Sequence, residues 1–170
     1  MATDDEAYLA YVDRVQPTLR RVAYLLSQDW HRADDLVQGT LERIYLHWGK
    51  AAQAREPIAY ARTMLVRVFL SEQRTAWARR VVLLDRPPES AMAAEPDLAD
   101  RMAVEAALRE LPPRQRAVLV LRFYCDLSVE QTAETLHCSA GTVKSQAARG
   151  LAKLREALTE NTAAAAGTRS

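Results

Sequence analysis

Residues 127–155 carry two apolar stripes of helical period. A segment of only a few residues, in which the helical pattern is broken, separates them. The first stripe consists of Val129, Thr132, Ala133 and Leu136. Ser128 stands directly before it, and Gln131 follows Ser128 by three residues, which is the spacing of a capping box. Because one face alone is apolar, the pattern predicts a short amphipathic helix with Ser128 as its N-cap.

A second helix is predicted after a turn at His137 and Cys138, with Ser139 as its N-cap. Its apolar stripe consists of Val143, Ala147, Leu151 and Leu154. The opposite face carries Thr142, Ser145, Gln146, Arg149 and Lys153. A short helix that is braced by another, and that presents amide, hydroxyl and guanidinium groups, suits the major groove of DNA. The two stripes therefore predict a helix-turn-helix.

Composition agrees with an all-α protein. Of the 170 residues, 49% are hydrophobic, and only five are glycine. No apolar run approaches the length of about 18 residues that a transmembrane helix needs. The acidic N-terminus also lacks the basic and then apolar order of a secretory signal. We therefore expect a cytoplasmic protein without membrane insertion.

Charge is nearly balanced over the whole chain but alternates along it. The formal net charge is +1. Residues 1–80 hold 12 Lys/Arg and 10 Asp/Glu, residues 81–112 hold 3 and 7, and residues 113–170 hold 8 and 5. Since non-specific affinity for DNA grows with the number of phosphates neutralised, neither basic part predicts strong binding to DNA by itself.

The chain offers little chemistry for an enzyme or a cofactor. Cys125 and Cys138 lack the CxxC spacing of a metal site, so we expect thiols that behave as small apolar groups. His31, His47 and His137 form no paired acid–base or nucleophile arrangement, and no glycine-rich phosphate loop is present. The sequence therefore predicts no enzyme, no metal and no cofactor.

Three helices are predicted in the first 80 residues. The first has a narrow apolar stripe of Tyr8, Val12, Val15, Leu19, Val22 and Leu26. The second follows Asp29 as its N-cap and has Ala33, Val37, Leu41, Ile44 and Trp48 on one side. Residues 49–56 predict a loop, and Pro57 suits the first position of a third helix that runs to about Arg80. The exposed side of this helix is cationic, with Arg62, Arg67, Arg74, Arg79 and Arg80 against the single acid Glu72.

Residues 81–100 interrupt the helical pattern with three prolines and five acids, which predicts a flexible acidic linker. Helices over 101–111 and 114–124 then lead into the helix-turn-helix, and residues 159–170 predict a disordered tail. We therefore expect two small helical domains, 1–80 and 101–158, on a flexible linker.

The second domain resembles region 4 of bacterial sigma factors, which binds the −35 promoter element. The residues that carry the resemblance are 111–155, and the sharpest matches are LPPRQR, LRFY and SAGTVKS. In the first domain, ADDLVQGTLERIY (33–45) resembles the part of region 2 that docks on the clamp helices of the polymerase β′ subunit. The helix over 57–80 resembles the one that opens and reads the −10 element.

Two such domains without further regions are similar to the extracytoplasmic-function (ECF) group, in its actinobacterial branch. The resemblance implies an alternative sigma factor that binds core RNA polymerase at the β′ clamp helices and the β flap, with promoter DNA and an anti-sigma factor as further partners. It implies recognition of duplex −35 DNA and of melted −10 DNA.

Three groups of site residues follow from the faces and the resemblance together. The −35 group is Thr142, Lys144, Ser145, Gln146 and Arg149. The −10 group is Arg67, Ser71, Arg74, Trp77, Arg79 and Arg80. The polymerase group is Asp34, Asp35, Leu36, Gln38 and Thr40. Lys144 enters through the resemblance alone, because helical spacing directs it away from Arg149. Gln146, Val66-Arg67 and Ser71 depart from residues common in the family.

Two other functions fit the same helices. A stand-alone regulator would use residues 1–80 as a sensor or dimerisation domain and would bind a palindromic site as a symmetric dimer. An adaptor would hold polymerase or an anti-sigma factor without reading DNA. An Arg149→Ala substitution that left promoter choice unchanged would favour the adaptor.

Overall fold

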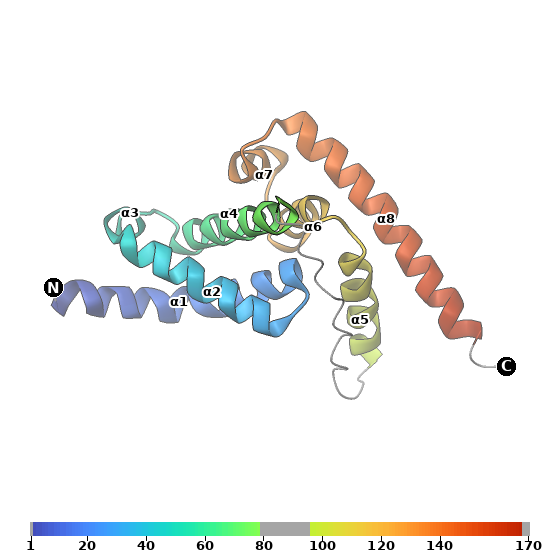
Figure 1. Ribbon diagram of the computed structural model, residues 1–170, viewed down its shortest axis with the longest axis horizontal. Coiled ribbons are helices and arrows are strands. Elements are labelled where there is room, and N and C mark those ends of the chain that lie inside the picture. The colour runs from blue at the N-terminus through green and yellow to red at the C-terminus, as the bar shows by residue number, and fades with distance from the viewer. Residues whose placement is uncertain (1, 79–95, 168–170) are drawn as a thin grey trace. The chain divides into compact units, whose positions relative to one another are not determined.

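The computed structural model describes residues 2–78 and 96–167, and every element in these two ranges is helical (Figure 1). The chain divides into two compact units, Met1–Val81 and Val82–Ser170, which we call unit 1 and unit 2. The expected all-α, two-domain fold is confirmed. Among the described residues, no helix combines the length and the apolar character that crossing a membrane requires.

Unit 1 is built from three long helices and one short one. They are α1 (Ala2–Ser27), α2 (Trp30–Leu46), α3 (Trp48–Ala52) and α4 (Pro57–Ala78). Helices α1, α2 and α4 pack against one another. The largest apolar side chains of this core are Val15, Leu19, Val22, Leu26, Ile44, Leu65, Val66 and Phe69. The apolar stripes predicted for the first two helices therefore face the interior, and Asp29 is the N-cap of α2 as predicted, accepting from the amides of His31 and Arg32.

The predicted loop over 49–56 is wrong in its first half, because α3 occupies Trp48–Ala52. The chain leaves α2 at His47, and the Trp48 ring then packs edge-on against Tyr8 and Tyr11, with centroid distances of 5.5 and 5.4 Å. Tyr11 also donates its hydroxyl to the Pro57 carbonyl at 3.1 Å, which ties α1 to the start of α4. Burial is the main reason that the pKa of Tyr11 is raised to about 12, so this hydroxyl remains a donor even at an alkaline pH that would ionise a free tyrosine.

In its described range, 96–167, unit 2 consists of four α-helices and a π-helical turn. They are α5 (Pro96–Arg109), α6 (Pro113–Leu119), η1 (Val120–Tyr124), α7 (Val129–Leu136) and α8 (Ala140–Gly167). Helix α8 contacts α5, α6 and α7. At Gly150 the backbone of α8 comes so near to α6 that an added Cβ would lie 3.2 Å from the Leu119 side chain. The glycine suits this close approach, because a Cβ here would require the Leu119 side chain to shift slightly.

Three boundaries of unit 2 differ from the prediction. The helix expected from residue 101 begins at Pro96, because proline suits the first helical position, so residues 96–100 of the predicted linker are helical. The tail predicted over 159–170 is helical as far as Gly167, in keeping with the high helix propensity of its alanines. The helix expected over 114–124 changes from α to π at Val120. The rest of the predicted linker, 81–95, lies outside the described residues, as do residues 79–80 at the end of the predicted third helix and residues 168–170.

The helix-turn-helix has the predicted caps. Ser128 Oγ accepts from the Gln131 amide at 3.0 Å, and the Gln131 side chain accepts from the Ser128 amide at 2.9 Å, so the capping box is complete. At the turn, His137 adopts the left-handed conformation (φ 51°). The Cys138 amide donates to Ala133 O at 3.0 Å and the His137 amide to Glu134 O, which is a Schellman motif with histidine in place of glycine.

We predict that Ser128→Ala lowers the stability of unit 2 by about 1 kcal/mol, because it removes an N-cap acceptor. Urea unfolding of the full chain, with hydrogen exchange to assign the change to α7, measures the effect. Ser145→Ala is the matched control, since Ser145 is exposed within α8 and bonds only the Thr142 carbonyl of its own helix. Equal losses in the two variants would contradict the capping role.

Candidate nucleic-acid interface

The start of α8 and the direction of its outer face are fixed by contacts in the turn and in the core. Ser139 Oγ accepts from the Thr142 amide at 3.1 Å and also pairs with the Thr142 hydroxyl at 2.9 Å. Val143 is fully buried, and Gly150 is buried against α6. These contacts fix the rotation of α8, and therefore the residues that it presents to solvent.

The five residues predicted for the −35 group lie together in the first half of α8. Lys144, Ser145 and Arg149 are exposed, whereas Thr142 and Gln146 are half-buried. Thr142, Ser145 and Arg149 follow one another at steps of three and four and share one side of the helix. Lys144 is exposed on another side, as the helical spacing predicts. The structure thus presents hydroxyl, amide and guanidinium groups on one surface.

Three arginines in the LPPRQR and LRFY segments bind backbone carbonyls, a role that the sequence did not reveal. Arg116 donates through Nε to Leu108 O at 2.8 Å, and through Nη2 to Arg109 O at 3.2 Å and Leu111 O at 3.0 Å. Leu108 and Arg109 are the last two residues of α5 and Leu111 follows the helix, and a positive charge is favourable at such a C-terminal end. Arg116 therefore caps α5 from α6.

The other two arginines act on the segments around α7. Arg122 donates to Leu127 O just before α7, and Arg114 Nη2 donates to Leu136 O at its last residue, at 3.4 Å. Helix α7 is thus held at both ends by side chains from α6 and η1. No spacing in the sequence indicates these bonds, because donor and acceptor come from elements that meet only in the folded unit.

The −10 group lies on α4 of unit 1. Arg67 and Arg74 are exposed and Ser71 is half-buried, at steps of four and three along one side of the helix. Val66, in contrast, is fully buried in the core. Trp77 lies in the last turn of α4, but its side chain is outside the described part of the chain, and so are Arg79 and Arg80.

The polymerase group on α2 divides between surface and core. Asp34, Asp35 and Gln38 are exposed. Leu36 is 3% exposed and Thr40 is 0% exposed, and the Thr40 hydroxyl donates to Leu36 O at 2.7 Å. In this structure the two side chains therefore lie in the core, and the part of the polymerase group at the surface is Asp34, Asp35 and Gln38. Leu36 and Thr40 lie on the buried side of α2, together with the apolar stripe. The resemblance matched the whole segment, so it did not distinguish the buried side of the helix from the exposed side.

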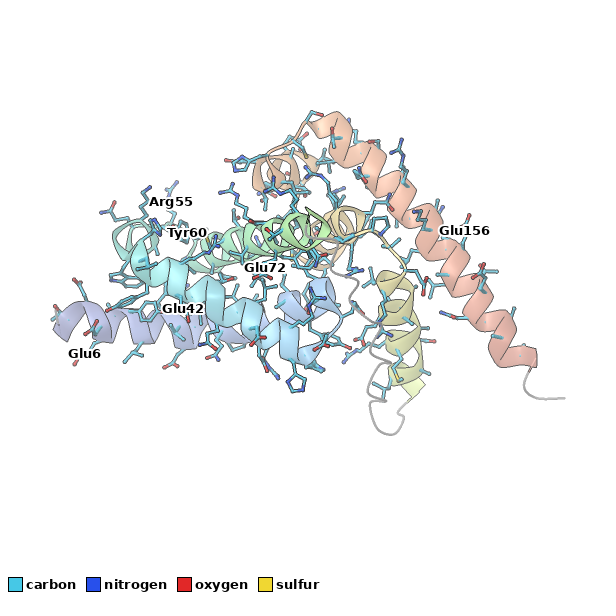
Figure 2. All side chains as sticks on the ribbon, in the orientation of Figure 1. Glu6, Glu42, Arg55, Tyr60, Glu72 and Glu156 are labelled. Carbon is cyan, nitrogen blue, oxygen red and sulfur yellow. The ribbon has the colours of Figure 1, made fainter. Side chains whose placement is uncertain are left out.

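The acidic face of α2 is linked to α1. Arg20 Nε donates to Asp34 Oδ1 at 2.8 Å, and this hydrogen bond is the main reason that the pKa of Asp34 is lowered. The Arg20 guanidinium also lies over the Trp30 ring, 4.5 Å from its centroid, and Trp30 stacks on Tyr24 at 4.1 Å. Farther along α2, Glu42 adds another exposed carboxylate (Figure 2).

These features define a class of protein: an all-helical chain with a helix-turn-helix that presents polar and cationic groups in one unit, and a cationic helix and an acidic helix face in the other. Residues 11–79 match the family model of Sigma-70 region 2, and residues 101–154 match that of Sigma-70, region 4. The RNA polymerase sigma-E factor of Streptomyces avermitilis is 40% identical over 153 residues, which is 87% of this chain and 83% of the relative.

Other relatives carry the group name. The ECF RNA polymerase sigma factor SigL of Mycobacterium tuberculosis is 33% identical over 156 residues, covering 89% of this chain and 88% of SigL. The solved structure of the sigma factor RpoE from Bartonella quintana, in complex with the anti-sigma factor NepR, is similar with a TM-score of 0.72 at 27% identity. It covers 91% of this chain and 98% of that one. This chain belongs to the ECF group of the sigma-70 family, and it is an alternative sigma factor that directs promoter-specific transcription initiation.

We predict that Arg116→Ala destabilises unit 2 by about 2–3 kcal/mol, because it removes charge-assisted bonds to the end of α5. Urea unfolding measures the loss, and faster hydrogen exchange in peptides of α5 locates it. Arg155→Ala, an exposed arginine on α8, is the control with the same change of charge and should alter stability by less than about 0.5 kcal/mol. An unchanged exchange rate in α5 of the Arg116 variant would contradict the cap.

Proposed function

We propose that the chain binds a promoter through two surfaces. The outer side of α8 binds duplex −35 DNA, and the exposed side of α4 binds the melted −10 strand. The observation that carries the proposal is the fixed rotation of α8. With Val143 and Gly150 buried, Arg149 and Ser145 are directed outward. We assign these roles to regions 101–158 and 1–80, with 81–100 as the connection.

Base recognition at −35 follows from the chemistry of the exposed groups. The Arg149 guanidinium suits the O6 and N7 acceptors of guanine, and the Gln146 amide suits the N6 and N7 edge of adenine. Thr142 and Ser145 supply hydroxyls for phosphate or base edges. Lys144 projects from another side of α8, which suits a phosphate contact flanking the groove.

At −10, the cations of α4 suit single-stranded DNA. Arg67 and Arg74 would follow the phosphates while Ser71 offers a hydroxyl between them. Unstacking a base costs a few kcal/mol, and contacts to the separated strand recover that cost. Trp77, Arg79 and Arg80 extend the same face in the sequence and remain part of the proposal.

The acidic side of α2 is the proposed contact with core RNA polymerase. Asp34, Asp35 and Gln38 would meet a basic surface of the β′ clamp helices, and unit 2 would meet the β flap. The similar RpoE structure contains the anti-sigma factor NepR, which supports an anti-sigma factor as a further partner of this chain. The proposed action is binding without catalysis, in the bacterial cytoplasm where polymerase works.

Polymerase is an essential part of this mechanism. In unit 2, Arg114, Arg116 and Arg122 bind carbonyls of their own unit, which leaves fewer cations for phosphates. A linker does not by itself fix the separation of two weak sites. Docking both units on polymerase would raise their effective concentration at the promoter without any new contact to DNA.

We expect the free protein to retain duplex promoter DNA only weakly in a gel shift, whereas addition of core polymerase should give specific complexes. Permanganate footprinting should then detect an opened −10 region. A promoter with a scrambled −35 element is the control. Tight, specific binding by the free protein would contradict the mechanism and favour a stand-alone regulator.

We predict that Arg149→Ala in the holoenzyme weakens promoter binding by about 1–3 kcal/mol and relaxes selectivity at one −35 base pair. Binding to a panel of single-base −35 variants measures both effects. Arg155→Ala on the same helix is the matched control, because it removes an equal charge away from the proposed face. Unchanged promoter choice in the Arg149 variant would favour the adaptor function.

A further inference from the structure

We propose that Arg20 is an internal competitor of polymerase docking: its guanidinium occupies the Asp34 carboxylate, which a cation of polymerase must take over when α2 docks. The inference rests on the proposed function of the acidic side of α2. It adds a regulatory residue on α1, a helix that contributes no residue to the predicted polymerase group.

The contact between Arg20 and Asp34 is close enough to occupy the carboxylate and exposed enough for a partner to replace it. Arg20 Nε and Asp34 Oδ1 are 2.8 Å apart, and the two residues belong to different helices. Their side chains are 49% and 55% exposed, so a partner can reach the carboxylate without unfolding the unit. Until it does so, the charge of Asp34 is compensated within the chain, and a basic surface is attracted chiefly by the other exposed acids of α2, Asp35 and Glu42.

Arg20 has a second site ready when it is displaced. Its guanidinium already lies 4.5 Å from the centroid of the Trp30 ring, and Trp30 is 45% exposed and held parallel to Tyr24, with 13° between the rings. A cation over an indole face is favourable at an exposed position. Release of Asp34 therefore leaves Arg20 with a partner, which makes the exchange reversible.

The size of the effect follows from the exposure of the pair. Exposed ion pairs stabilise weakly, so Arg20 should reduce the affinity of docking without preventing it. We expect Arg20→Gln to bind core polymerase about two- to fivefold more tightly than the wild-type chain. Arg21→Gln is the matched control, because Arg21 is its exposed neighbour on α1 and the change of net charge is identical.

The experiment is a double-mutant cycle on the full chain, with the dissociation constant for core RNA polymerase as its readout and circular dichroism as the check of folding. Its four proteins are wild type, Arg20→Gln, Asp34→Asn and the double variant, with Arg21→Gln beside them. We expect Asp34→Asn to weaken binding, and to weaken it by a larger factor in the Arg20→Gln background, where the carboxylate is no longer occupied.

The outcomes separate this inference from the function on which it rests. If Asp34→Asn leaves the dissociation constant unchanged in both backgrounds, Asp34 is not part of the docking face, and that part of the proposed function fails. If Asp34→Asn weakens binding while Arg20→Gln binds no more tightly than Arg21→Gln, the competitor role of Arg20 is overturned. An equal factor for Asp34→Asn in the two backgrounds also overturns it.

Discussion

The close approach of α8 to α6 determines which side of α8 unit 2 can present to DNA. Gly150 packs so closely on Leu119 that a Cβ at position 150 would lie 3.2 Å from the Leu119 side chain. Val143, two helical turns earlier in α8, is fully buried. Together these two positions fix the rotation of α8 about its own axis. A recognition helix needs that constraint, because a rotation by one residue would replace Arg149 with an alanine or a glycine on the outer face.

The short helices of unit 2 impose a second constraint, which concerns charge. Each helix end leaves backbone carbonyls or amides without a helical partner, and short helices expose many such ends for each buried residue. Here Ser128 satisfies the start of α7, and Arg116 satisfies the end of α5. The arginines that hold these carbonyls stabilise the fold, and the same use limits how many phosphates the unit can neutralise. The use of these cations within the fold thus supports the proposed mechanism, in which polymerase assists the binding of DNA.

The sequence predicted best where the physics is local. Helical period and caps located the helix-turn-helix, and Ser128, Asp29 and Ser139 all cap as expected. Tertiary effects were missed: α2 ends before His47, and Trp48 of the next helix packs against two tyrosines of α1. Leu36 and Thr40 were assigned to a partner because a family resemblance marks a segment, whereas burial is decided by the side of the helix.

The same distinction between a segment and a surface applies to the proposed docking face of α2. Asp34 and Asp35 are adjacent acids in the sequence, yet only for Asp34 is an ion pair with Arg20 of α1 seen, because successive residues on a helix point about 100° apart. A partner that approaches α2 therefore meets a composite of two helices. When binding depends on several weak contacts made together, a modest change in one of them alters occupancy of the whole assembly. An exposed ion pair of small energy is sufficient for such tuning, whereas a buried pair would resist exchange with a partner.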